Sequence, residues 1–330
     1  MVQYYDSDFS FEEHRIECEQ KLQSTTSSST CTSNHEDDED LASLNPMTQA
    51  QCWDDFHTAH SHGNFFKPRR YILKCFPCIL NHCAADNNLA QNIENCNQRY
   101  RLVLEVGCGS GSSCLPILKH CNDEHKQTKI LACDCSAVAV DVCKSVIESS
   151  KDTIVVKNFG AFVSDPSLEV GEAETTFPED VKAAYEKLTG EKTEGVNDIG
   201  LADVVLMVFV LSAVPPKRVT RFMKQIFNTA KSGGKVCFRD YALYDLPMMR
   251  FKETHYVHST CSDSDGAAPR LYERGDGTLS RFFDLETVKC IFEAAGFVEE
   301  DLRYATVFNE NRKTGDRLKR AFVHSVFRKP

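Results

Sequence analysis

The chain has 330 residues, a net charge of −10 and 42% hydrophobic residues, which suits one large α/β domain with appendages or at most two modest domains. No stretch approaches the ~18 uninterrupted apolar residues that a membrane helix needs. The acidic N-terminus also lacks the basic region and apolar core of a secretory signal. We therefore expect a cytoplasmic protein with no membrane partner, and the nucleus as the alternative location.

Residues 1–45 are rich in Ser, Thr, Asp and Glu and show no sustained apolar period. This composition predicts a disordered, acidic tail. Residues 46–100 are expected to form a helical N-terminal extension that closes over the active site. The extension is aromatic and basic from Trp53 to Pro77.

One cysteine cluster in the extension has plausible zinc-ligand spacing. Cys75 and Cys78 form a Cys-x-x-Cys pair, with His82 and Cys83 close behind. No second paired cluster follows at the distance expected of a zinc finger. A packed segment without metal is therefore the favoured interpretation, and we assign no metal ligand.

From residue 101 to residue 330 strands and helices alternate, which predicts a mostly parallel sheet covered on both faces. The expected strands cover 102–106, 129–133, 153–157, 202–209 and 234–239, with two late antiparallel strands over 303–308 and 321–327. The expected helices cover 112–120, 136–148, 216–230 and 285–295.

Two charged stretches accompany this domain. An acidic insert over about 169–197 is most simply a solvated excursion. The stretch 309–330 is strongly basic. It predicts either a local basic face on an acidic protein or a merely solvated tail.

The chemistry is concentrated in a glycine turn at the end of the first strand. Glu105 precedes Gly107-Cys-Gly-Ser-Gly111, where missing side chains let a ligand approach the backbone and a helix N-terminus offers free N–H donors. The next strand ends in Asp134, where a carboxylate can accept ribose hydroxyl protons. The glycine spacing differs from the Gly-x-Gly-x-x-Gly of dinucleotide sites. It favours S-adenosylmethionine over NAD.

Longer strings of the chain match one known family over nearly everything from residue 53 to residue 330. They are Trp53-Asp-Asp-Phe56, Asn64-Phe-Phe-Lys67 with Arg69, Leu104-Glu-Val-Gly-Cys-Gly109, Ala132-Cys-Asp134, Phe209-Val-Leu-Ser-Ala213, Phe238-Arg-Asp-Tyr241 and Arg274-Gly-Asp-Gly-Thr278. On these strings the chain resembles the methyltransferase-like tRNA N3-methylcytidine methyltransferases.

The resemblance implies a Rossmann-like class I methyltransferase with a seven-stranded, mostly parallel sheet and an N-terminal extension that faces RNA. It also implies S-adenosylmethionine as cofactor and methylation of cytidine N3 at position 32, in the anticodon loop of some tRNAs. The implied partner is tRNA, joined in some family members by an aminoacyl-tRNA synthetase such as seryl-tRNA synthetase.

Residue roles follow from the matching motifs. The implied cofactor-binding residues are Trp53, Glu105, Gly107, Gly109, Asp134, Asp165 and Phe209. The implied substrate-binding residues are Phe65, Phe66, Lys67, Arg69 and Arg274, and the implied catalytic residues are Arg239, Asp240 and Tyr241. The chain departs from the family pattern at Pro68, Arg70, Tyr71 and Ala242, among other positions.

Neutral cytosine already carries a lone pair on N3, so catalysis mainly requires alignment of an unstacked base with the methyl group. We expect Asp240 to stabilise the cationic product base. For Arg239 the alternative is a structural ion pair with Asp240 or Asp245. A methyltransferase that acts on a small molecule or protein, and a non-catalytic RNA-binding relative, are the alternative functions.

Overall fold

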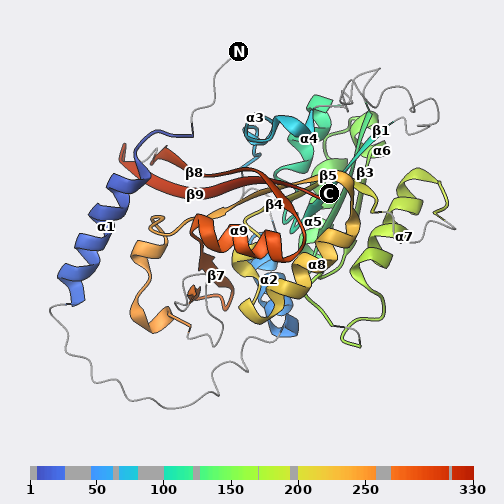
Figure 1. Ribbon diagram of the computed structural model, residues 1–330. Coiled ribbons are helices and arrows are strands. Elements are labelled where there is room, and N and C mark those ends of the chain that lie inside the picture. The colour runs from blue at the N-terminus through green and yellow to red at the C-terminus, as the bar shows by residue number, and fades with distance from the viewer. Residues whose placement is uncertain are drawn as a thin grey trace.

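The computed structural model shows a twisted central sheet with helices packed on both of its faces (Figure 1). The residues that the structure describes are 6–26, 46–61, 67–80, 100–121, 127–169, 171–193, 200–257, 269–311 and 314–330. The predicted α/β class is confirmed.

The central sheet has seven strands, and their bounds follow the predicted runs closely in most cases. They are β1 Tyr100–Val106, β2 Gln127–Asp134, β3 Phe159–Val163, β4 Ala202–Val208, β5 Ala230–Tyr241, β8 Val298–Glu310 and β9 Arg317–Arg328. Their order in the sheet is β3-β2-β1-β4-β5-β9-β8. The neighbours from β3 to β5 pair in parallel, and β9 is antiparallel to both β5 and β8. The predicted late antiparallel pair is therefore confirmed.

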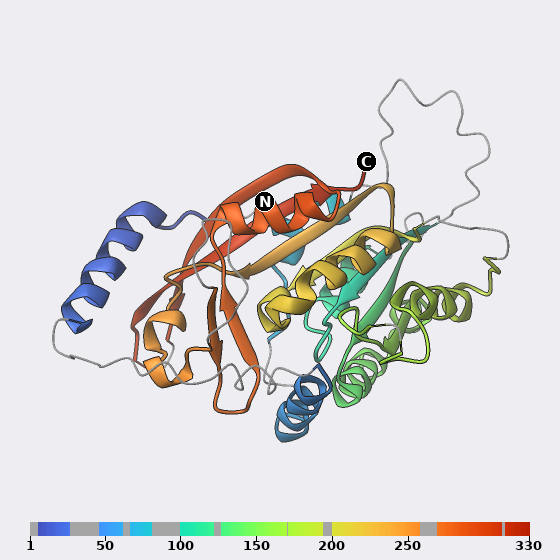
Figure 2. The same ribbon diagram turned by 60° about the horizontal axis from the view of Figure 1, so that its bottom comes forward.

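Helices cover both faces because alternate side chains of the buried strands point to opposite sides. One hydrophobic core cluster contains Leu104 of β1 and buried residues of α7 Phe177–Thr189, α8 Val219–Thr229 and α9 Leu285–Ala294. The cluster that contains Val103 holds α4 Cys114–Cys121, α5 Ala137–Glu148 and α6 Thr153–Lys157. Figure 2 shows α8 and α9 lying along one face of the sheet.

The remaining elements lie around this core. They are the helices α1 Phe11–Thr26, α2 Pro46–Ala59 and α3 Ile72–Cys75, the 3-10 turns η2 Pro77–Ile79, η4 Leu211–Ala213, η5 Pro216–Arg218, η6 Met248–Arg250 and η7 Glu253–His255, and the strands β6 Arg270–Glu273 and β7 Leu279–Phe282. Strands β6 and β7 form a separate antiparallel hairpin. Among the described residues, no helix is both long enough and apolar enough to cross a membrane.

The strand order places a topological switch point between β1 and β4. β1 pairs with β2 on one side and with β4 on the other. The connection after β1 therefore runs toward one edge of the sheet, and the connection after β4 runs toward the other. Ligands of doubly wound sheets bind in the crevice that opens at the carboxyl ends of such strands.

The strand expected over 153–157 is wrong, because this segment is the short helix α6 and the strand follows at 159–163. Asp152 decides the local structure: its Oδ1 accepts the N–H groups of Ile154 and Val155 and caps the helix. A capping carboxylate satisfies donors at a helix start, and here it outweighs the strand preference of a β-branched run.

The acidic insert is not only a solvated excursion, because its central part forms α7. Phe177, Val181 and Tyr185 recur at helical spacing and are buried against the core that includes β1. The acidic side chains lie on the outer face of an amphipathic helix. Residues 194–197 of the predicted insert lie outside the described residues.

The disordered tail expected over residues 1–45 is wrong for residues 6–26, while 1–5 and 27–45 lie outside the described residues. Ser7 forms a parallel bridge with Thr306 of β8, and Asp6 pairs with Arg303 at 2.6 Å. The ring of Phe11 stacks on Tyr304, with centroids 3.4 Å apart. These tertiary contacts hold α1 beside the ends of β8 and β9 (Figure 1).

The basic C-terminal stretch is not a solvated tail, because β9 occupies 317–328 in the interior of the sheet. Lys319 pairs with Glu17 of α1 at 2.7 Å. Arg320 pairs with Asp245 through two hydrogen bonds of 2.8 Å. The basic side chains of β9 are therefore carried by an ordered strand, while residues 312–313 lie outside the described residues.

We expect Phe11→Ala to release α1 from the sheet. An isolated helix of this length is marginal in water, so loss of the stacked ring should lower its local stability by about 1–3 kcal/mol. Amide hydrogen exchange over residues 11–26 should then quicken by roughly 10- to 100-fold. The control is Ile16→Ala, since Ile16 is 44% exposed. Unchanged protection in Phe11→Ala would contradict the anchoring role.

Candidate active site

A cavity of about 870 Å³ opens at the carboxyl ends of the parallel strands. Most of the residues implied by the sequence motifs line it together: Trp53, Lys67, Arg69, Gly107, Gly109, Asp134, Asp165, Phe209, Arg239, Tyr241 and Arg274. Glu105 and Asp240 are buried and do not line it. Phe65 and Phe66 lie outside the described residues.

The glycine turn after β1 forms a wall without side chains. A Cβ on Gly107 would lie 2.5 Å from Val210 Cγ2, and the residue has φ +66°. Gly109 has φ +49°, and a Cβ there would find only His57 Cε1, at 3.6 Å, within 4 Å. Residues that carry a side chain rarely adopt such positive φ angles. The turn therefore presents bare backbone to a ligand, as the sequence predicts.

Asp134 stands at the end of β2 beside this turn. Gly109 N–H donates to its Oδ2 at 2.9 Å and Ser136 N–H donates to its Oδ1 at 3.0 Å. Burial raises the pKa of Asp134 to about 6, against these two bonds, which lower it. The carboxylate keeps lone pairs toward the cavity, where ribose hydroxyls can donate to it.

Glu105 lies beneath the turn with 1% of its surface exposed. Its Oε2 accepts a hydrogen bond from Cys114 Sγ at 2.7 Å, while Oε1 has no hydrogen-bond partner among the described residues. Arg69 Nη1 is 4.0 Å from Oε1. Burial raises the pKa of Glu105 to about 7. An orphaned buried oxygen beside a bare turn fits the ammonium group of S-adenosylmethionine.

Helix α2 covers the cofactor side of the cavity. Asp54 Oδ1 accepts from Ser136 Oγ at 2.6 Å and from Val138 N–H at 3.3 Å, which ties α2 to the start of α5. At the other end of the helix, Gln49 Nε2 donates to Gly277 O at 3.0 Å, which ties α2 to the β6–β7 turn. The helix is therefore held as a lid between the two halves of the site.

Sequence reasoning missed His57, which also lines the cavity. Burial lowers the pKa of His57 to about 4, so its imidazole is neutral at pH 7. Trp53 and His57 lie one helical turn apart on α2, and this i, i+4 spacing is the signal that could have found it. Asp165 completes this side: its Oδ1 accepts Ser167 N–H at 2.8 Å, and burial raises its pKa.

Phe209 and Tyr241 both line the cavity and stack on each other, with ring centroids 4.9 Å apart and planes 28° apart. Phe209 has φ +62°, a strained conformation for a residue with a side chain. Its N–H donates to Arg239 O at 2.8 Å, which holds the strained residue against the end of β5.

Asp240 does not face the cavity, contrary to the sequence expectation. Its side chain is fully buried, and its Oδ2 accepts Ser212 N–H at 3.0 Å. Burial raises the pKa of Asp240 to about 6. Tyr241 and Arg239 flank it on β5 and do line the cavity. Because alternate side chains of a strand point to opposite faces, Asp240 instead fixes the loop that carries Phe209.

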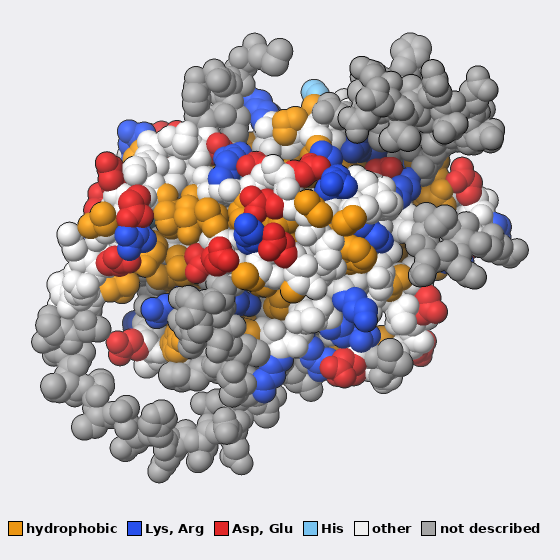
Figure 3. Space-filling view, in the orientation of Figure 1, with side chains coloured by type: hydrophobic (Ala, Val, Ile, Leu, Met, Phe, Trp, Pro, Cys, Tyr) orange, Lys and Arg blue, Asp and Glu red, His pale blue; other side chains and the backbone are white. Residues whose placement is uncertain are grey.

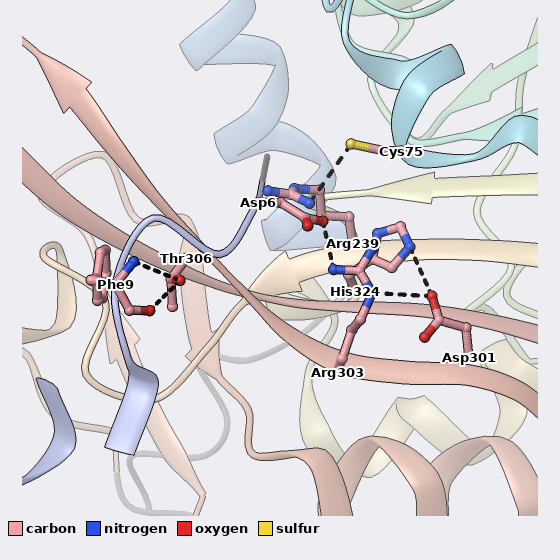
Figure 4. A network of polar contacts seen from close by, with 8 residues as sticks. All are labelled: Asp6, Phe9, Cys75, Arg239, Asp301, Arg303, Thr306 and His324. Carbon is pink, nitrogen blue, oxygen red and sulfur yellow. Dashed lines mark hydrogen bonds and ion pairs between the residues drawn. The ribbon is translucent and has the colours of Figure 1, made fainter. Parts of the chain in front are cut away.

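Arg239 is 1% exposed and lies over two aromatic rings, 4.7 Å from the centroid of Phe322 and 5.8 Å from that of Tyr71. Its Nη1 is 3.9 Å from Cys75 Sγ, and Figure 4 marks this contact between β5 and the segment that carries Cys75. No carboxylate of the described residues forms a salt bridge with it, and its Nε has no hydrogen-bond partner there. The alternative ion pair with Asp240 or Asp245 is therefore not found.

Hydrogen bonds fix the guanidinium groups of Arg274 and Arg69 at the cavity wall. Arg274 Nη1 donates to Leu279 O at 3.1 Å, and its Nη2 donates to Ser280 Oγ at 3.1 Å. Arg69 Nη1 donates to Ser113 Oγ at 3.1 Å. Lys67, by contrast, is exposed at the cavity wall.

The four candidate zinc ligands of the extension do not form a described metal site. Cys75 contacts Arg239, and Cys78 Sγ lies 3.3 Å from Cys237 Sγ. His82 and Cys83 lie outside the described residues. In the parts of the chain that can be described, no group of three or more metal-ligating side chains occurs.

Comparison with known proteins agrees with this geometry. A family model described as a methyltransferase domain matches residues 82–301. A tRNA N(3)-methylcytidine methyltransferase of Drosophila melanogaster is 30% identical over 278 residues, which cover 84% of this chain and 70% of that protein. The chain belongs to the family of tRNA N(3)-methylcytidine methyltransferases.

Two further relatives extend the comparison. The tRNA(Thr) (cytosine(32)-N(3))-methyltransferase of Saccharomyces cerevisiae is 28% identical over 89% of this chain, which spans only 38% of that longer protein. The crystal structure of a SAM-dependent methyltransferase from Anabaena variabilis aligns with a TM-score of 0.50 at 10% identity, covering 85% of this chain and 95% of that one. This structure supports the class I fold alone.

We expect Glu105→Gln to strengthen the fold while weakening cofactor binding. Burial raises the pKa of Glu105 to about 7, so the folded state favours the protonated carboxyl. The stability that this proton confers on the fold is fully present below the unfolded-state pKa and is lost as the pH rises through about 7. A neutral amide avoids that loss. Unfolding free energy at about pH 8 should rise by roughly 1–3 kcal/mol, and this gain should shrink at about pH 5.

The same variant should bind S-adenosylhomocysteine at least about tenfold more weakly in calorimetry, since the amide offers no charge to the ligand ammonium. Glu148→Gln, at an exposed position on α5, is the control and should change neither quantity. A Glu105→Gln protein with unaltered affinity would show that Glu105 has no part in the cradle.

Proposed function

We propose that the protein is an S-adenosylmethionine-dependent tRNA methyltransferase that transfers a methyl group to N3 of cytidine 32 in the anticodon loop of a subset of tRNAs. The observation that carries this proposal is one cavity lined by the glycine turn and Asp134, by the stacked rings of Phe209 and Tyr241 and by Arg274, in a member of this family.

S-adenosylmethionine, when bound, supplies an electrophilic methyl group on a sulfonium. At the glycine turn Asp134 lines the cavity and is placed to accept ribose hydroxyl protons. Glu105 lies buried beneath the turn, so its carboxylate acts on the ammonium through its charge. The lid residues Trp53 and His57 close over the glycine turn. Because His57 is neutral at pH 7, it adds no positive charge beside a cationic ligand.

The acceptor side needs a base to be unstacked and presented edge-on. The stacked rings of Phe209 and Tyr241 offer a surface for a pyrimidine, as aromatic side chains do for single-stranded RNA. N3 already has a lone pair, so no residue must remove a proton. Methylation makes the base cationic, and the faces of these rings can stabilise that cation in place of the buried Asp240.

Arg274 is suited to a phosphate that flanks the extruded nucleotide, whereas the buried Arg239 shapes the cavity wall through its packing on Phe322 and Tyr71. Both lie on the cavity wall, and Arg239 forms no salt bridge with a carboxylate of the described residues. Acidic and basic side chains are interspersed on the face that Figure 3 shows, with no broad basic surface there. Phosphate binding is therefore expected to concentrate at the cavity rather than over that face.

Assistance by an aminoacyl-tRNA synthetase such as seryl-tRNA synthetase is a further part of this proposal. So is a cytoplasmic location, with the nucleus as the alternative. Both rest on the family resemblance and composition alone, and neither is needed for the chemistry of the cavity.

The direct test incubates the protein and S-adenosylmethionine with a panel of native tRNAs and transcripts. Nucleoside mass spectrometry then measures 3-methylcytidine. We expect product on a subset of tRNAs and none when cytidine 32 is replaced by uridine, whose N3 carries a proton. Methylation of small molecules or proteins without any tRNA product would overturn the proposal.

We expect Arg239→Lys to slow tRNA methylation by about 10- to 100-fold, because an ammonium cannot reproduce the planar guanidinium that packs on Phe322 and Tyr71 and shapes the wall that the substrate meets. Affinity for S-adenosylhomocysteine should stay within about twofold, since Arg239 lies on the acceptor side.

The matched control is Arg101→Lys. Arg101 is also buried, at 9% exposed, but it lies at the start of β1 and outside the cavity. Equal losses of methylation in both variants would mean that Arg239 acts through folding rather than through the cavity wall.

A further inference from the structure

The segment from α3 through η2 lies across one face of β5. Cys75 Sγ is 3.9 Å from Arg239 Nη1, and Cys78 Sγ is 3.3 Å from Cys237 Sγ. Positions 237 and 239 point to the same side of the strand. The Cys-x-x-Cys pair of the segment therefore meets two successive residues on this face of β5.

The contact between Cys78 and Cys237 joins residues 159 positions apart in sequence. Both thiols are free, Cys237 is fully buried and Cys78 is half-buried. A disulfide has its sulfurs about 2.05 Å apart, so the pair needs to close by only about 1.3 Å. Cys78 is thus the partly exposed member of the pair, and Cys237 is the buried one.

The surroundings of Cys78 favour its thiolate. The hydrogen bond with Cys237 lowers the pKa of Cys78 against burial, which raises it, and the nearby cations Lys235 and Arg101 lower it further. Burial raises the pKa of Cys237 well above its ordinary value. Nε and Nη1 of Arg101 have no hydrogen-bond partner among the described residues. Cys78 is therefore the nucleophile of the pair and Cys237 its resolving partner.

We propose that Cys78 and Cys237 are a disulfide-forming modification site, which a two-electron oxidant such as hydrogen peroxide closes. The Cys78 thiolate attacks peroxide and becomes a sulfenic acid, and the displaced oxygen leaves as water. The Cys237 sulfur then attacks the Cys78 sulfur, and the hydroxyl leaves with the Cys237 proton as a second water. Two thiols and one peroxide give one disulfide and two waters.

The disulfide would act on the cavity wall. Arg69 and Tyr71 lie just before this segment and line the cavity, and Cys75 contacts Arg239. A covalent link at Cys78 would pin the segment to β5 and move it by about the distance that the sulfurs close. Displacements near 1 Å are enough to slow a reaction that depends on alignment.

The test treats the 330-residue chain with hydrogen peroxide, blocks the remaining thiols and identifies cross-linked peptides by mass spectrometry. We expect a peptide that joins Cys78 to Cys237 and that dithiothreitol reverses. Cys78→Ser should abolish it, and Cys290→Ser should not, although Cys290 is exposed. Oxidation of Cys290 together with unlinked or over-oxidised Cys78 would overturn the proposal.

A second measurement concerns the cavity wall. The oxidised wild type should methylate tRNA at least about fivefold more slowly than the reduced protein, and dithiothreitol should restore the rate. Cys78→Ser should be insensitive to peroxide. A linked peptide with an unchanged rate would refute the effect on the cavity wall. Because the peptide is detected without any turnover, its absence is distinguishable from failure of the proposed activity.

Discussion

The close contact between the glycine turn after β1 and the loop after β4 is the constraint on which the cavity depends. A Cβ on Gly107 would lie only 2.5 Å from Val210 Cγ2. The segments that follow β1 and β4 can therefore approach each other this closely only because position 107 has no side chain. Phe209 takes a left-handed conformation beside this contact, and the buried carboxylate of Asp240 holds the following turn through Ser212. The side-chain-free turn at Gly107, the strained Phe209 and the buried Asp240 therefore act together to shape one wall of the cavity.

Charges of both signs gather at the cavity in a way that the net charge of −10 conceals. Asp134 and Glu105 lie at the glycine turn, where burial raises the pKa of each, whereas Arg239 lies near the end of β5 and Arg274 beside the β6–β7 hairpin. Methyl transfer from a sulfonium to neutral cytosine moves a positive charge rather than creating one. A site built for it needs anions near the donor, and aromatic faces rather than a strong acid or base near the acceptor.

The sequence indicated the parallel core and the residues at its carboxyl ends, because buried strands and the glycine turn are local patterns. It could not show which way Asp240 points, since one residue of register decides whether a strand side chain faces the cavity or the loop behind it. It also misassigned the regions that contain α1, α6 and α7. In each region a single contact outweighs the structure that composition predicts. These contacts are the stacking of Phe11 on Tyr304, the cap that Asp152 forms at the start of α6, and the burial of Phe177 in the core. The contact between Cys78 and Cys237 is likewise visible only after folding.

The two sides of the cavity differ in how far apart in the sequence their residues lie. Much of the donor side comes from the first two strands and the turns that follow them, so its chemistry can be read from a short motif. The acceptor wall is assembled from distant segments, including Asp8 before α1, Phe308 at the end of β8 and Arg320 on β9. Asp8 Oδ2 accepts Phe308 N–H at 2.9 Å, so the N-terminal segment is part of that wall. Differences in RNA preference among relatives with the same donor motif should therefore arise in these distant segments, because they can change without disturbing the glycine turn.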